Sequence, residues 1–265
     1  MIARLPVPSD VKLMNTTASV LFFACAVLLL AALVSWALRH PLFALGGITV
    51  QGDMTHSSAV TLRANVAPQV AGNFFTVNLD TTREAFEAVP WVRKAIVRRE
   101  FPNRLRVSLQ EHQAVAFWGA EGESRLVNNF GEVFEANLDD LEQDGLPRLF
   151  GPTGESTQVL AMYQALKPLF EPLDLAVEQL VLTGRGSWQL ALDTGAVIEL
   201  GRGTRQEVAA RTQRFLQTLT QVTSKYGRRP EALVSADLRH ADGYAVRLRG
   251  VSTIAADAQK TQKQK

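Results

Sequence analysis

The strongest pattern in the chain is one long apolar run near its start. Residues 18–38 read ASVLFFACAVLLLAALVSWAL and contain no charged residue. As an α-helix this run would be ~32 Å long at about 1.5 Å per residue, close to the hydrocarbon thickness of a bilayer. A helix also bonds its own backbone polar groups, as lipid requires. The run therefore predicts a single transmembrane helix over 18–38, preceded by a tail over 1–17.

The charges beside this run predict its orientation. Arg4, Lys12 and the terminal amine precede it, whereas Arg39 is the only lysine or arginine that follows before residue 63. Basic residues favour the cytoplasmic side. We therefore expect the tail in the cytoplasm and everything after about residue 40 outside it. A cleaved signal peptide is the alternative, although its apolar core is typically only about 7–15 residues long.

Alternating and helical patterns follow in a fixed order. A strand pattern over 42–51 precedes a short amphipathic helix over 57–67. A second helix is expected to begin at Thr81, because Glu84 three residues later completes a capping box. Pro90 ends that helix, since the residue before a proline is disfavoured in the α region.

A β-hairpin comes next. Residues 91–100 form one arm, 101–103 the turn, and apolar and polar residues alternate in the second arm from Arg104 to Leu109. The predicted order over 42–113 is therefore β-α-α-β-β. The hairpin is rich in basic residues: Arg93, Lys94, Arg98, Arg99, Arg104 and Arg106. These indicate either an anionic partner, such as a lipid surface, an acidic protein or nucleic acid, or a solvated strand face that discourages edge pairing. The expected location outside the cytoplasm argues against nucleic acid.

From Ala114 to about residue 250 the pattern changes to short strands separated by glycine turns. The expected strands lie within 114–119, 124–129, 131–136, 146–154, 177–182, 188–192, 196–200, 233–238 and 244–248. The pair Asp242-Gly243 has the composition of a hairpin turn between the last two. The polar run over 251–265 cannot bury apolar surface and is expected to be disordered.

Two helices interrupt these strands. The first covers 155–167, and Pro168 and Pro172 are expected to terminate it. The second follows Thr204, whose capping box with Glu207 precedes an apolar stripe at helical spacing. The residues of that stripe are Val208, Phe215, Leu219, Val222 and Tyr226.

Composition and candidate chemistry argue against several functional classes. The net charge is only +2, so the chain as a whole offers no argument for nucleic acid. The only cysteine, Cys25, lies inside the apolar run, so an intramolecular disulfide is excluded. The two Gly-Arg-Gly triplets lack the spacing of a phosphate loop, and no pair of His, Cys or carboxylate residues has metal-ligand spacing. We therefore expect no cofactor, no metal and no enzymatic activity.

Eight segments, in order, resemble one known family. They read ITVQGD, NFFTVNLD, VPWVRKAIVRREFPNRLRVSLQEH, AFW, LVNNFGEVFEA, LPRLFGP, SWQLALDTGAVIELGRG and VSADLRHADGYAVRL. Together with the apolar run they are similar to the FtsQ/DivIB cell-division family of the proteobacterial type. The resemblance implies an α+β fold with a POTRA domain over 42–113 and a β-rich domain with two helices over 114–250.

The resemblance also implies a function. Members of the family are scaffolds of the divisome at the septum of the inner membrane, where they link early and late division proteins and help to control septal peptidoglycan synthesis. The β domain would bind FtsB and FtsL, and the POTRA domain would meet FtsK and other division proteins. The contact positions carried over to this chain are Arg185, Asp237, Leu238, Arg239, His240, Gly243, Tyr244, Ala245 and Val246.

A physical argument supports that site independently. A terminal strand can leave an open edge, to which an incoming strand adds through main-chain hydrogen bonds. Arg185 and Arg239 could then pair with carboxylates of the partner. The alternative is that Arg239 and Tyr244 only cover a solvent-exposed face. Two other functions stay open: a POTRA-bearing envelope assembly or secretion factor, although no series of amphipathic barrel strands follows, and a membrane-anchored envelope hydrolase.

Overall fold

The computed structural model describes residues 9–38, 40–70, 72–138, 141, 145–240 and 243–251. The chain divides into two compact units between Glu111 and His112. The start of the expected cytoplasmic tail, Asp242 of the expected hairpin turn and nearly all of the tail expected to be disordered lie outside the described residues.

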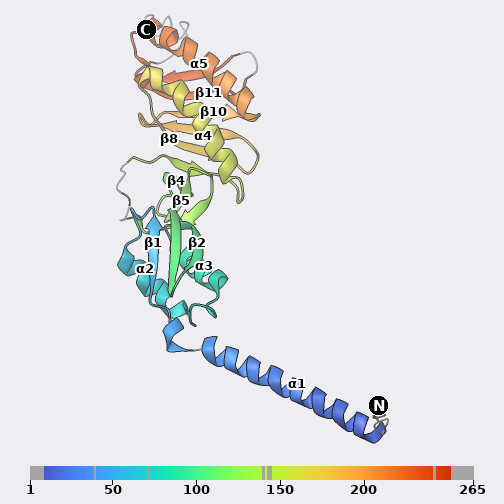
Figure 1. Ribbon diagram of the computed structural model, residues 1–265. Helices are drawn as coiled ribbons and strands as arrows, with labels where there is room; N and C mark the ends of the chain where they lie inside the picture. Colours follow the sequence, from blue (N-terminus) through green and yellow to red (C-terminus); the bar gives the residue numbers. More distant parts are fainter. Residues whose placement is uncertain are drawn as a thin grey trace, which may run out of the picture. The chain divides into compact units, whose positions relative to one another are not determined.

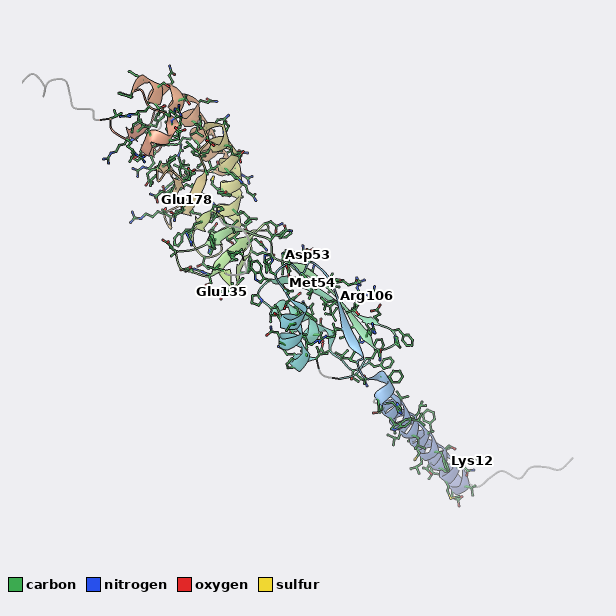
Figure 2. All side chains as sticks on the ribbon, turned by 90° about the vertical axis from the view of Figure 1, so that its left-hand side faces the viewer. Lys12, Asp53, Met54, Arg106, Glu135 and Glu178 are labelled. Atoms are coloured by element: carbon green, nitrogen blue, oxygen red, sulfur yellow. The ribbon has the colours of Figure 1, made fainter. Side chains whose placement is uncertain are left out.

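The apolar run forms a helix, α1 (Ser9–Leu38), that begins before the run itself. Lys12, labelled in Figure 2, lies near its start. By length and composition, this is the one helix among the described residues that could cross a membrane.

The rest of the first unit is a three-stranded sheet with two helices (Figure 1). Its elements are a 3-10 turn (Pro41–Phe43), β1 (Gly47–Gly52), α2 (Ala59–Val66), a 3-10 turn (Ala67–Gln69), α3 (Leu79–Glu87), β2 (Val92–Glu100) and β3 (Arg104–Glu111). β3 is central, parallel to β1 and antiparallel to β2. The β-α-α-β-β order is therefore confirmed. The strand expected from residue 42 begins only at Gly47, because the chain first makes the 3-10 turn.

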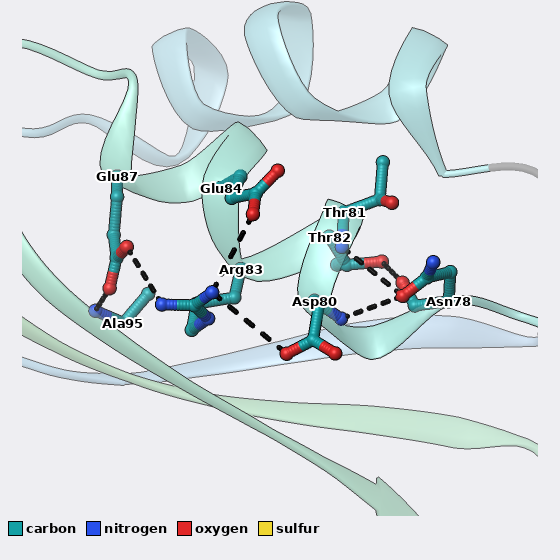
Figure 3. Close-up of polar contacts among 8 residues, drawn as sticks. All are labelled: Asn78, Asp80, Thr81, Thr82, Arg83, Glu84, Glu87 and Ala95. Carbon is teal, nitrogen blue, oxygen red and sulfur yellow. Dashed lines mark hydrogen bonds and ion pairs between the residues drawn. The ribbon is translucent and has the colours of Figure 1, made fainter.

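The predicted start of α3 is wrong for a local reason. Asn78 is the N-cap, and its side-chain oxygen accepts hydrogen bonds from the backbone N–H groups of Asp80 (2.9 Å) and Thr81 (3.3 Å) (Figure 3). An asparagine cap satisfies the free N–H groups of a first turn. Thr81 therefore already lies inside the helix. At the other end, Glu87 ties α3 to the sheet, because it accepts a hydrogen bond from the backbone of Ala95 (3.1 Å).

A buried carboxylate at the end of β3 holds the segment that precedes α2. Glu111, at the end of β3, is only 5% exposed and accepts backbone hydrogen bonds from Thr55 (3.0 Å), His56 (3.0 Å) and Ser57 (2.8 Å). The ring of His56 stacks on Trp91 with centroids 3.9 Å apart. Burial raises the pKa of Glu111, but the hydrogen bonds from Ser57 and His56 outweigh burial and hold the pKa below its usual value.

Glu111 should make the first unit sensitive to acid. Because its pKa is lower in the folded state, the carboxylate stabilises the fold above its unfolded pKa of about 4.3, and this stabilisation is lost as the pH falls through the folded pKa. We expect Glu111→Gln to lower the free energy of unfolding by about 2–3 kcal/mol at neutral pH and to flatten the pH dependence below about pH 4.3. Urea unfolding followed by hydrogen exchange of β2 and β3 measures both. The exposed Glu84→Gln is the control, and an equal loss in both variants would contradict this role.

The second unit is one nine-stranded sheet in the order β12-β11-β10-β9-β8-β7-β4-β5-β6. Its strands are β4 (Ala114–Trp118), β5 (Arg125–Asn128), β6 (Val133–Glu135), β7 (Arg148–Phe150), β8 (Val177–Leu182), β9 (Trp188–Leu192), β10 (Val197–Gly201), β11 (Leu233–Asp237) and β12 (Ala245–Leu248). Two helices, α4 (Ser156–Phe170) and α5 (Arg205–Lys225), pack against each other and against the sheet (Figure 1). Shorter 3-10 turns span Glu171–Leu173 and Pro230–Ala232. This confirms the α+β fold class.

The predicted end of α4 and the predicted start of α5 have different outcomes. Pro168 lies inside α4 rather than ending it, whereas α4 does end at Phe170, just before Pro172. Leu166 and Phe170, on either side of Pro168, are fully buried. Their burial holds the last turn despite the hydrogen bond that a proline cannot make. The capping box of α5 is confirmed, with the Thr204 backbone N–H donating to Glu207 (2.8 Å).

The apolar stripe of α5 is confirmed over most of its length. Val208, Phe215 and Leu219 are buried in the core of the second unit. Tyr226, by contrast, is 47% exposed, because it is the C-cap residue and no longer follows the helical face.

Candidate partner-binding site

β12 is one edge of the nine-stranded sheet, and no described strand pairs with its outer side. The backbone N–H of Leu238 donates to the carbonyl of Glu199 on β10 (2.8 Å), so the backbone of Ala236, two residues earlier, also faces β10. Val246 lies opposite Ala236 in the antiparallel pair. Its N–H and C=O groups therefore point away from β11, and the open edge offers hydrogen-bonding groups to an added strand.

An ion pair fixes the end of β11. Arg239 donates two side-chain hydrogen bonds to the carboxylate of Asp237 (2.9 and 2.6 Å), and its backbone N–H donates a third (3.0 Å). These bonds, with the positive charge of Arg239, lower the pKa of Asp237 to about 2. Asp237 therefore stays ionised and braces Arg239, whose side chain remains 58% exposed.

Beside this pair lies an open groove of about 950 Å³. Four arginines, Arg185, Arg202, Arg211 and Arg239, line it together with a single carboxylate, Glu199. Such an excess of guanidinium groups favours an anionic ligand that can accept paired hydrogen bonds. We call the hollow lined by these four residues the arginine groove.

The arginines differ in how far they are already engaged. Arg211 donates to the carbonyl of Leu200 at the end of β10, so it is held by the fold. The side chains of Arg185 and Arg202 are exposed, and neither guanidinium makes an ion pair or hydrogen bond with another described residue, although the backbone carbonyl of Arg202 accepts a hydrogen bond from Arg211 (3.3 Å). Their charges are the ones most available to a partner.

A second hollow of about 430 Å³ adjoins the groove through Arg211. Leu238, His240, Gly243 and Tyr244 line it, along with residues of α5. Tyr244 is half-buried: its ring meets Phe215 edge-on with centroids 5.0 Å apart, and its hydroxyl lies 2.5 Å from the hydroxyl of Thr218. Tyr244 therefore anchors the chain before β12 to α5.

The nine residues expected at the site fall into four groups. Arg185 and Arg239 line the arginine groove, and Leu238, His240, Gly243 and Tyr244 line the second hollow. Ala245 and Val246 belong to the open strand, and Asp237 braces Arg239. Leu238 is only 1% exposed, so its side chain supports the site from the core.

Sequence reasoning missed Arg202 and Arg211. Arg202 stands in a Gly-Arg-Gly triplet that lacks the spacing of a phosphate loop, and the two glycines permit the turn from β10 into α5. Arg211 lies two turns into α5, and only the packing of that helix beside β10 brings it to the groove. Among the described residues, no group of three or more His, Cys, Asp or Glu side chains could hold a metal ion.

Comparison with known proteins agrees with this arrangement. The FtsQ-type POTRA domain matches residues 43–112, and the C-terminal domain of cell division protein FtsQ/DivIB matches residues 116–239. The chain is 38% identical to Cell division protein FtsQ of Thiomonas arsenitoxydans over 247 residues, which cover 92% of this chain and 90% of that protein. It is also 38% identical to the FtsQ of Burkholderia pseudomallei over 244 residues, covering 92% and 95% of the two chains.

The chain belongs to the FtsQ/DivIB cell-division family. As a member of this family it has a role in cell division, and α1, as a candidate membrane helix near the N-terminus, fits a single-pass membrane protein. The first unit after α1 is a POTRA domain of the FtsQ type, and the second carries the C-terminal domain of the FtsQ/DivIB family.

Proposed function

We propose that this member of the FtsQ/DivIB family is a non-enzymatic divisome scaffold that binds FtsB and FtsL through the edge of β12. It links early and late division proteins and thereby helps to control septal peptidoglycan synthesis. Residues 18–38 anchor it in the inner membrane at the septum, with a cytoplasmic N-terminus and with the domains over 42–113 and 114–250 in the periplasm. The POTRA domain serves FtsK and other division proteins.

The observation that carries this proposal is the open edge of β12. Tyr244, just before this strand, lines the second hollow, which shares Arg211 with the arginine groove. The outward backbone groups of Val246 can pair with an added strand. Main-chain pairing by itself does not depend on the partner's sequence, so selectivity has to come from side chains that the partner contacts beyond the paired strand. Arg185 and Arg202 supply it, because they favour a partner segment that carries carboxylates.

The charge of the arginine groove gives the first test. We expect Arg185→Glu to weaken binding of an FtsB-like peptide by about 10- to 100-fold, since it removes a charge-assisted hydrogen bond worth about 1.5–3 kcal/mol. Isothermal titration with the detergent-solubilised full chain measures the affinity. Arg229→Glu is the matched control, because Arg229 is exposed in the same unit and lines neither hollow. Equal affinities for both variants would rule out the groove as the selective element.

A further inference from the structure

Four phenylalanines gather at one end of the POTRA domain. The ring centroids of Phe43 and Phe75 are 4.9 Å apart, those of Phe74 and Phe75 are 5.2 Å apart, and those of Phe74 and Phe101 are 6.4 Å apart. Phe101 is 80% exposed and Phe75 is 43% exposed, although Phe74 is buried. We call these four residues the phenylalanine cluster, and it presents contiguous aromatic surface to its surroundings.

The cluster is joined to α1 by a very short piece of chain. The helix ends at Leu38, and Phe43 follows five residues later. Five residues reach about 17 Å at most, whereas the headgroup region extends about 5–8 Å beyond the hydrocarbon on each side. The backbone N–H of Phe74 donates to the carbonyl of Phe43 (2.8 Å), so the rings move with that residue. A membrane-spanning α1 therefore keeps the cluster within reach of the lipid headgroups.

The basic hairpin supplies charge at the same end of the domain. The segment from Arg98 to Arg106 contains four arginines and one glutamate. Arg106, labelled in Figure 2, pairs with Glu100. The exposed Arg98 and Arg104 make no ion pair with another described residue.

The fourth arginine has a structural role. Arg99 donates hydrogen bonds to the carbonyls of Phe74 (2.7 Å) and Val77 (2.8 Å). It thereby fastens the loop that carries two of the four rings onto β2. Since Phe74 also meets Phe101 in the hairpin turn, this loop is held beside the turn that lies between Arg98 and Arg104.

We propose that this end of the POTRA domain docks on anionic lipid beside its own membrane helix. Phe75 and Phe101 enter the interface, where aromatic rings are favoured, and Arg98 and Arg104 lie against lipid phosphates. The occupant is lipid rather than protein because the short connection to α1 holds the patch at the bilayer. The basic hairpin plays no part in the proposed partner-binding site on β12, and lipid docking gives it a role. Each of these two proposals can be disproved without the other.

The test places a tryptophan in the patch of the full chain. Phe101→Trp is prepared with Trp36→Phe, which removes the tryptophan of the membrane helix; the other three tryptophans are buried in the folded units. The protein is inserted into nanodiscs that contain phosphatidylglycerol and lipids brominated near the headgroup. Ser108→Trp in the same background is the control, because Ser108 is exposed on β3 but four residues from Arg104, about 14 Å away.

We expect bromine to quench the emission of Phe101→Trp severalfold more strongly than that of Ser108→Trp. Adding Arg98→Gln and Arg104→Gln should weaken docking by about fivefold per arginine at low salt, so the quenching falls toward that of the control. Replacing phosphatidylglycerol with phosphatidylcholine in the nanodiscs should lower the quenching of Phe101→Trp in the same way. The proposal is overturned if Phe101→Trp is quenched no more strongly than Ser108→Trp, or if its quenching depends on neither lipid charge nor the two arginines. The patch would then be a binding site for an acidic protein.

Discussion

Val246→Pro is expected to abolish capture of an FtsB-like segment while the second unit stays folded. Proline has no backbone N–H and is tolerated on the open side of an edge strand. The N–H of Val246 faces away from β11, so its loss removes no bond of the existing sheet. Once a partner strand pairs with β12, however, Val246 would lie in a central strand, where a proline blocks the ladder.

The expected loss is large because one substitution leaves a partner carbonyl without its donor and disturbs the pairings on either side. An unsatisfied buried acceptor costs about 1–3 kcal/mol, so with the neighbouring pairings the affinity should fall by about 100-fold or more. Titration of the full chain with the peptide measures this loss, and hydrogen exchange of β11 and β10 shows whether the sheet remains intact.

A matched variant separates the backbone from the side chain. Val246→Thr keeps the N–H and nearly the same shape, so it should bind within a few-fold of the parent protein. If Val246→Pro bound as well as Val246→Thr with an intact sheet, strand addition at β12 would be wrong and the arginine groove alone would have to account for recognition.

The site shows what a sequence can and cannot predict. The last two strands, over 233–238 and 244–248, were predicted on either side of the Asp242-Gly243 turn, but whether β12 lies at an edge depends on the order of nine strands. That order is set by long-range pairing that no local pattern encodes. Tyr244 illustrates the consequence: from sequence it looks like a contact residue, whereas its packing on Phe215 makes Tyr244→Asp a change to the fold as well as to the site.

Local sequence signals predicted the structure correctly where nothing competed with them, and they failed where another cap or tertiary packing competed. The capping box at Thr204 had no nearby rival and is formed. Thr81 and Glu84 had the same spacing, but Asn78 lies one turn earlier and caps the helix first. Pro168 predicted a helix end, yet the burial of Phe170 outweighs the missing hydrogen bond. In each failure, a nearby cap or tertiary packing overrode a correct local preference.

Phe215→Ala is expected to be the most destabilising of the substitutions considered. The ring is only 1% exposed, sits on the inner face of α5 and meets Tyr244 edge-on. Removing a buried phenylalanine loses its transfer free energy and leaves a cavity, which together cost about 3–5 kcal/mol. Phe215→Leu keeps much of the volume and should cost under about 1.5 kcal/mol.

For Phe215→Ala, both the size of the lost stability and the strands in which hydrogen exchange accelerates are informative. Urea unfolding of the detergent-solubilised chain, followed by hydrogen exchange of β9 and β10, gives the free energy of unfolding of the second unit. Because Phe215 supports Tyr244, exchange in β12 should accelerate more than exchange in β8, and peptide capture should weaken in parallel. A loss below about 1 kcal/mol would show that the cavity collapses, and equal acceleration in both strands would show that the loss is spread over the whole unit. Tyr244 would then hold the edge strand in place without the ring beneath it.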